Sequence, residues 1–184
     1  MRLALRLAAL SLCLSFTAHA QNFTLDSPDI VPAKPIANKH VFNGFGCEGE
    51  NISPAVVWRG APKDTKSFAL TVYDPDAPTG SGWWHWLMID IPAHLHGLPQ
   101  GVGDPAAGRA PKGARQTRTD FGKPGWGGPC PPKGDKPHRY IFTVHALKVD
   151  KLDVPEDATG ALVGYMINAN RIDKASFTGH YGRK

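Results

Sequence analysis

Three short motifs place side chains able to donate, accept or transfer protons near strand-like runs of the 184-residue chain. The first is Asp-Pro-Asp-Ala-Pro at residues 74–78, and the second is Trp-Trp-His-Trp at residues 83–86. The third is a proline-rich loop that begins at residue 127 and delivers His138 and Tyr140. Imidazolium N–H groups and a tyrosine hydroxyl are donors suited to an anionic group. A nearby aspartate can orient the imidazoles and raise their pKa, or receive the ammonium group of a zwitterionic ligand.

Each motif alone also has an ordinary structural explanation. Asp-Pro-Asp commonly terminates a strand, and a histidine among tryptophans can be a satisfied core residue. In combination, the motifs supply carboxylates, two imidazoles and a phenol that can converge at one rim of a sheet. Proline rings and Trp83 would then form the rigid apolar walls that small-ligand pockets have. The sequence therefore predicts a small-ligand site.

Alternating apolar residues predict three strands that position these motifs, at residues 67–73, 83–91 and 139–148. Two shorter runs, at residues 23–25 and 55–58, predict edge strands. Regular alternation in the second of the three strands puts Trp83 and His85 on one face of the sheet. The same alternation puts the other two tryptophans of the motif, Trp84 and Trp86, on the opposite face.

Elsewhere the pattern is different. Leu162, Met166 and Ala169 recur at helical spacing and predict a helix that begins near Pro155. Residues 92–138 show no regular period. Eight basic and two acidic residues lie between positions 109 and 139, which indicates either a functional loop or a solvated basic surface.

The first twenty residues are predicted to be a secretory signal peptide. Arg2 and Arg6 precede an apolar run too short to span a bilayer, and Ala18 and Ala20 suit the cleavage positions. This disfavours the alternative, an N-terminal membrane anchor. Residues 21–184 are predicted to form one domain, located in the periplasm or secreted, without stable membrane insertion. Its 20 glycines and 17 prolines argue against a helical bundle.

Removal of the signal peptide changes the charge and the cysteine count. The chain carries 21 basic and 16 acidic residues, and loss of two arginines lowers the net charge from +5 to +3. This modest excess favours local attraction of anions over nucleic-acid binding. Cys13 is also lost, and the remaining Cys47 and Cys130 are predicted to form a disulfide in an oxidising compartment. Two buried free thiols are the alternative.

The remaining histidines carry less weight. His145 lies within a predicted strand and is interpreted as structural, whereas His40 and His180 are expected to face solvent. His94 and His96 lie in a loop without a carboxylate at suitable spacing, so the pair is not expected to bind a metal. We expect neither a metal ion nor a cofactor.

The motifs at residues 74–78, 85–87 and 128–140 together resemble the signature of the phosphatidylethanolamine-binding protein family. That family includes the Raf kinase inhibitor proteins and plant flowering regulators. The bacterial branch is the most similar, through residues 45–54 and 174–179, and the resemblance covers essentially the whole chain after the signal peptide. It implies a mainly β fold, an antiparallel β-sandwich with a C-terminal helix and long pocket-forming loops.

The resemblance also implies the residues of an anion-binding pocket. Asp74, His85 and His138 match the ligand-binding triad of the family. Three further residues match wall and rim positions of the family's pocket: Trp83, Pro132 and Tyr140. Asp76 matches the motif, although its position suits the turn better than the ligand. A cis peptide near these prolines is implied as well. Cys130 stands where many non-bacterial relatives have glycine, so a bridge to Cys47 would clamp the pocket wall.

Three functions follow, in order of preference. The first is an exported protein that binds small anions or phosphate groups, on a phospholipid head group or a phosphorylated ligand, with a regulatory or scavenging role. The second is a regulator with a protein partner, such as a protease- or kinase-inhibitor-like module, although kinase control fits poorly with export. The third is a hydrolase or metal-dependent enzyme that uses Asp74, His85 and His138. No nucleophile elbow, P-loop or zinc motif is present, so an enzyme is not expected.

Overall fold

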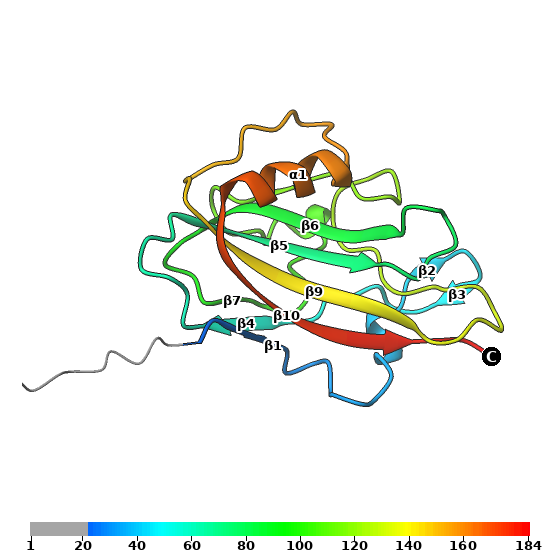
Figure 1. The fold of residues 1–184 in the computed structure, drawn as a ribbon. Helices are drawn as coiled ribbons and strands as arrows, with labels where there is room; N and C mark the ends of the chain where they lie inside the picture. The colour runs from blue at the N-terminus through cyan, green and yellow to red at the C-terminus, as the bar shows by residue number, and fades with distance from the viewer. Residues whose placement is uncertain (1–21) are drawn as a thin grey trace, which may run out of the picture.

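The computed structural model describes residues 22–184, so the predicted signal peptide lies outside the described residues. The described chain is mainly β, as predicted, with a single α-helix near its C-terminal end (Figure 1). The strands are β1 (Thr24–Asp26), β2 (Asn43–Gly44), β3 (Cys47–Glu48), β4 (Val56–Arg59), β5 (Ser67–Asp74), β6 (Trp83–Pro92), β7 (Gly97–Leu98), β8 (Arg115–Gln116), β9 (His138–Leu147) and β10 (Arg171–Tyr181). The helices are α1 (Gly160–Asn170) and two 3-10 turns, Asn38–His40 and Pro105–Ala107.

The predicted antiparallel β-sandwich is confirmed. Five strands pair in the order β10-β9-β5-β6-β8, three pair in the order β1-β4-β7, and β2 pairs with β3. The two larger sheets enclose the main core, in which Trp58 of β4 contacts Phe68 of β5 with ring centroids 5.2 Å apart. Alternate residues of β5 and β9 point into this core, because side chains alternate between the two faces of a strand.

Helix α1 covers the opposite face of the five-stranded sheet (Figure 1). Val163 and Ile167, one helical turn apart, pack with Leu87 and Ile89 of β6 in a second apolar cluster. A Cβ atom at Gly160 would lie 2.5 Å from the Trp84 ring, so glycine at this position lets the helix approach the sheet closely.

The predicted helix exists, but its start and its buried face differ from the prediction. It begins at Gly160, after Thr159, whose hydroxyl accepts a hydrogen bond from the Leu162 amide at 3.2 Å. The predicted start near Pro155 is wrong, because Thr159 provides the capping oxygen that a helix N-terminus needs. Leu162 is exposed, and Val163 faces the sheet in its place.

All three predicted long strands are confirmed within one residue at each end, and both predicted short strands are also present. The prediction that Trp84 and Trp86 share a face is wrong. Val72 pairs with Trp86 and Tyr73 pairs with Trp84, so His85 is an extra residue without a partner. This β-bulge turns Trp86 into the main core, while Trp84 packs toward α1.

Strand β10 was not predicted from the sequence. Its eleven residues pair with the whole of β9 and form one edge of the five-stranded sheet. The carbonyl of His180, near the end of β10, accepts a hydrogen bond from the Ile36 amide at 2.8 Å. Segment 35–36 therefore covers that end of the strand's outer edge.

Two smaller expectations are also corrected. His40 is fully buried and not solvent-facing, because its Nδ1 lies 2.6 Å from the carbonyl oxygen of Ile52. The implied cis peptide is not found anywhere in residues 22–184. Within the same range, no helix has the length and apolar character that a membrane crossing requires.

Candidate functional site

The ends of three neighbouring strands meet at a cavity of about 180 Å³. Strand β5 runs antiparallel to β6 and β9, so its last residue lies beside the first residues of both partners. The cavity is lined by six of the seven residues predicted to bind a ligand: Asp74, Trp83, His85, Pro132, His138 and Tyr140. Sheet topology therefore brings together motifs that are far apart in the sequence.

A buried aspartate–histidine pair lies at this cavity. His138 Nδ1 is 2.8 Å from Asp74 Oδ2, and the two side chains are only 5% and 3% exposed. Because a carboxylate can only accept, Nδ1 carries the proton. The other carboxylate oxygen, Asp74 Oδ1, accepts from the Asp76 amide at 2.8 Å, so both oxygens of Asp74 are engaged. His138 Nε2 has a longer contact, 3.4 Å, with the half-exposed Asp135.

His85 makes different contacts in the cavity from those of His138. Its Nδ1 donates to the carbonyl oxygen of Gly127 at 2.6 Å, which fixes the orientation of the ring. Burial lowers the pKa of His85 to about 4, although the carboxylates of Asp74 and Asp120 act in the opposite direction. His85 is therefore neutral at pH 7, and Nε2 is an acceptor. Toward the cavity, His85 therefore presents an acceptor in the free protein, whereas an imidazolium donor was expected from the sequence.

Tyr140 is the third polar group of the cavity. Its ring meets that of His85 edge-on, with centroids 5.0 Å apart. The Tyr140 hydroxyl is buried and has no hydrogen-bond partner among the described residues. Burial raises the pKa of this hydroxyl, so it keeps its proton as a donor.

Aromatic side chains form one wall of the cavity. Phe121 lies between Trp83 and His85, at centroid distances of 5.4 Å from each. Phe121 also contacts Phe42 at 4.5 Å and Phe45 at 6.0 Å. Phe45 is 70% exposed and lines the cavity, so an apolar ring stands at the entrance. Sequence reasoning missed Phe45 and Phe121 as cavity residues.

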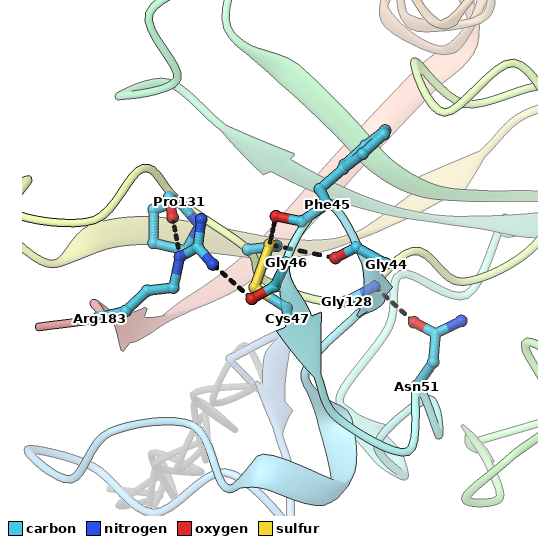
Figure 2. The surroundings of a disulfide bond; sticks show 9 residues. Gly44, Phe45, Gly46, Cys47, Asn51, Gly128, Pro131 and Arg183 are labelled. Carbon is cyan, nitrogen blue, oxygen red and sulfur yellow. Dashed lines mark hydrogen bonds between the residues drawn. A yellow bond between two sulfur atoms is a disulfide. The ribbon is translucent and has the colours of Figure 1, made fainter.

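The predicted disulfide between Cys47 and Cys130 is present, with Cα atoms 6.0 Å apart (Figure 2). It joins β3 to the proline-rich loop, and Cys130 itself lines the cavity. Cys130 Sγ lies 3.6 Å from the carbonyl oxygens of Gly44 and Phe45. The bridge therefore ties the segment that carries Phe45 to the loop that carries Pro132, as the resemblance implied.

Arg183 fastens the same two segments a second time (Figure 2). Its Nη1 donates to the Gly46 carbonyl at 2.9 Å, and its Nε donates to the Pro131 carbonyl. This arginine lies two residues from the end of β10, so the C-terminal segment reaches the cavity wall. Sequence reasoning did not identify Arg183, because nothing in its neighbourhood signals contact with carbonyls far away in the sequence.

The start of the proline-rich loop is anchored independently of these two clamps. Asn51 Oδ1 accepts from the Gly128 amide at 2.8 Å (Figure 2), and Asn51 Nδ2 donates to the Trp126 carbonyl at 3.1 Å. A Cβ atom at Gly128 would lie 2.1 Å from the His40 carbonyl oxygen, so only glycine fits there. This anchoring holds the Gly127 carbonyl where His85 donates to it.

Asp76 is the one predicted ligand-binding residue that does not line the cavity. Both of its carboxylate oxygens accept from the Arg139 guanidinium, at 2.7 and 2.9 Å, and Oδ2 also accepts from the Arg139 amide. These hydrogen bonds lower the pKa of Asp76 to about 2. The pair joins the turn after β5 to the start of β9, which is a positioning role.

The other predicted features are structural or lie outside the cavity. His145 donates to or accepts from Thr71 at 3.1 Å in the sheet, and His94 and His96 are exposed. Among residues 22–184, no group of three or more His, Cys, Asp or Glu side chains is spaced to hold a metal ion.

Comparison with known proteins adds a second line of information. The sequence model of the phosphatidylethanolamine-binding protein family matches residues 27–182. The UPF0098 protein YbcL of Escherichia coli is 54% identical over 168 residues, which are 91% of this chain and 92% of YbcL. YbhB of the same organism is 51% identical over 154 residues, 84% of this chain and 96% of YbhB.

Solved structures agree with the sequence matches. The crystal structure of E. coli YbcL, described as a new member of the mammalian PEBP family, aligns with a TM-score of 0.86. That alignment covers 88% of this chain and 99% of the YbcL chain at 54% identity. A PEBP homolog from Chlamydia trachomatis aligns with a TM-score of 0.73 at 28% identity, covering 89% of this chain and 99% of the other.

Proposed function

Because the chain belongs to the phosphatidylethanolamine-binding protein family, we propose that its cavity binds the phosphate group of a small ligand. One observation carries the proposal, the buried pair of His138 and Asp74 at 2.8 Å. His138 Nδ1 donates to Asp74, so Nε2 is the nitrogen left for a ligand. The side chain that Nε2 contacts in the free protein, Asp135, lies 3.4 Å away and is 42% exposed. A phosphate oxygen can therefore replace it at little cost.

The walls of the cavity suit a small charged group attached to a short apolar or polar stem. Proline and aromatic rings exclude water from the sides, which strengthens hydrogen bonds made inside. The volume of about 180 Å³ is small for a drug-sized molecule, which favours a head group or a single phosphate. Arg183 and Arg139 lie nearby but are committed to carbonyls and to Asp76.

Binding without chemical turnover is part of the proposal. Thr79 and Cys130 are the cavity residues of the serine, threonine or cysteine type that a histidine base activates as nucleophiles. The Thr79 hydroxyl donates to the Gly82 carbonyl at 2.6 Å, and Cys130 is in a disulfide. Neither is hydrogen-bonded to His85 or His138, which an activated nucleophile would require.

An exported location completes the proposal. The Cys47–Cys130 disulfide supports maturation in an oxidising compartment. The signal peptide predicted from residues 1–20 is the route by which the chain would reach the periplasm or the medium. Mass spectrometry of the protein purified from its native host tests the cleavage, and a chain that keeps its first twenty residues would contradict a cleaved signal peptide.

The binding proposal is tested by titration with inorganic phosphate and with phosphoethanolamine, followed through the histidine ring signals by NMR. We expect the signals of His85 and His138 to shift in metal-free solution. His138→Ala should weaken phosphate binding by about tenfold or more, since a hydrogen bond to a charged group is lost.

The control is His94→Ala, which removes an exposed histidine in a loop away from the cavity and should leave the affinity for phosphate unchanged. Wild-type affinity in His138→Ala would contradict the proposal. Shifts that occur only after zinc is added would favour a metal site in its place.

A further inference from the structure

The polar groups at the cavity differ in the hydrogen-bonding capacity they have left. Both oxygens of Asp74 are engaged, by the Asp76 amide and by His138. His138 Nε2 faces the carboxylate of Asp135 at 3.4 Å, so a ligand that replaces Asp135 meets the N–H that this contact requires. The Tyr140 hydroxyl is a donor without a partner among the described residues. His85 is the exception, because its only proton is already given to the Gly127 carbonyl at 2.6 Å.

The surroundings of His85 keep it in this state. The ring is 3% exposed and packs against Phe121 and Tyr140, neither of which carries charge. The ionisable groups around it are Asp74 on β5, His138 and Tyr140 on β9, and Asp120 in the loop after β8. Both carboxylates are already hydrogen-bonded, Asp74 to His138 and Asp120 to the Trp84 amide at 2.7 Å. Burial outweighs their attraction and lowers the pKa of His85 to about 4.

A phosphate oxygen without a proton cannot form a hydrogen bond with His85 Nε2, because both atoms are acceptors and repel each other. An oxygen that carries a proton makes a hydrogen bond there. On the basis of the proposed function, we propose that the bound state contains one proton shared between His85 Nε2 and a phosphate oxygen. Because of this shared proton, the cavity selects phosphate monoesters over phosphate diesters. A monoester can carry this proton near neutral pH, whereas a diester has no titrating oxygen to bring it.

The selectivity is tested with a matched pair of ligands, phosphoethanolamine and glycerophosphoethanolamine. Both carry the same ammonium group and linker, and they differ in the glycerol that the diester carries on a second ester bond. We expect the monoester to bind at least about tenfold more tightly at pH 7, which corresponds to one hydrogen bond to a charged group. Inorganic phosphate, which also has a proton-carrying oxygen, should behave like the monoester.

Proton uptake is measured by calorimetry at pH 7 in two buffers with different ionisation enthalpies. A phosphate monoester loses its second proton near pH 6, so about nine-tenths of it is dianionic at pH 7. Binding should therefore take up about 0.9 proton at pH 7 and about 0.1 at pH 5. The apparent affinity should rise about tenfold between pH 7 and pH 5.

His85→Gln is the specific variant. An amide keeps polar contacts but does not titrate, and it can present an N–H to an unprotonated oxygen. We expect proton uptake to disappear and the preference for the monoester to fall to about threefold or less. His94→Ala serves as the control and should keep both properties. If His85→Gln does not fold, the comparison of the two ligands and the proton uptake of the wild-type protein still test the proposal.

The outcomes separate this inference from the proposed function. If neither phosphate, monoester nor diester binds, the proposed function fails, and this inference with it. If monoester and diester bind equally and no proton is taken up, the phosphate site stands but the shared proton does not exist. A monoester preference that survives in His85→Gln would also overturn the assignment to His85.

Discussion

The Tyr140 hydroxyl is a buried polar group that the folded protein leaves without a partner in residues 22–184. A buried hydroxyl that makes no hydrogen bond loses its water contacts without compensation, at a cost of about 1–3 kcal/mol. Tyr140 lies on the strand β9 next to the His85 ring and lines the cavity. Such an unsatisfied donor is explained if a ligand oxygen accepts from it.

Tyr140→Phe tests this explanation, because it removes one oxygen and leaves the ring in place. We expect the free energy of unfolding to stay equal or to rise by about 1 kcal/mol, and the affinity for phosphate to fall roughly fivefold. Chemical denaturation and calorimetry measure the two quantities on the same sample. A variant that loses stability and binds phosphate as well as the wild type would assign the hydroxyl a structural role.

At the scale of single residues, the sequence indicated the polar members of the cavity and missed most of its apolar wall. Asp74, His85 and His138 were found because each belongs to a motif at one end of a recognisable strand, and β-strand pairing brings such ends together. Phe45 and Phe121 were missed because their contacts depend on loops whose paths the sequence does not encode locally. Asp76 was included only as part of its motif, while its side chain pairs with Arg139.

Two loops make up the wall opposite the histidines, and their separation is fixed by contacts from elsewhere. The disulfide ties Cys47 to Cys130 across a sequence separation of 83 residues, and Arg183 donates to a carbonyl on each side. A loop that is already ordered pays less entropy when a ligand binds against it. The two clamps are therefore expected to contribute to ligand affinity without contacting the phosphate.

Reduction of the disulfide is expected to weaken phosphate binding about 5- to 30-fold, or 1–2 kcal/mol, while the sheets remain folded. The free energy of unfolding should fall by about 2–5 kcal/mol. Arg183→Gln should have a smaller effect in the oxidised protein and a larger one after reduction, because the two clamps hold the same segments.

Calorimetry with phosphate, before and after reduction verified by thiol alkylation, measures these effects. The matched control for Arg183→Gln is Lys184→Gln, which removes a neighbouring charge that makes no hydrogen bond to either loop among those found in residues 22–184. Unchanged affinity after complete reduction would show that the bridge does not position the wall.

At the scale of elements, prediction worked where apolar residues alternate and failed where they do not. Strands β5, β6 and β9 are buried over most of their length, so large apolar residues recur along them and are visible in the sequence. Strand β10 buries only Ala175 and Gly179, because it is an edge strand with most side chains exposed. The bulge at His85 was not predicted for a different reason. One extra residue changes the sheet face to which the following side chains point, but it leaves the composition of the strand unchanged.

Across the whole molecule, buried neutral histidines make stability depend on pH. Burial lowers the pKa of His145 to about 3 and that of His85 to about 4, and it also lowers the pKa of His40. The unfolded chain takes up protons at these positions from about pH 6.5 downward, whereas the folded chain does not. Stability contributed by the neutral rings is therefore complete above pH 6.5 and is lost as the pH falls toward 3.

The expected result is a free energy of unfolding that decreases between pH 6 and pH 4, by on the order of 1 kcal/mol per pH unit for each buried histidine. His145→Gln should reduce this slope by the contribution of about one proton, because glutamine does not titrate. The glutamine amide can keep the contact with Thr71. Denaturant titrations at several pH values measure the slope, with His94→Ala as an exposed control. An unchanged slope in His145→Gln would mean that His145 is accessible to protons in the folded protein.

The two margins of the five-stranded sheet have a consequence for how copies of the protein meet. At one margin β8 is only two residues long. At the other, β10 begins with a bulge between Arg171 and Asp173, exposes the charge of Lys174, and ends under segment 35–36. Short, charged and partly covered margins discourage the addition of an incoming strand to this sheet. Crowded copies are therefore expected to meet through side chains at these margins, which disfavours growth of a shared sheet.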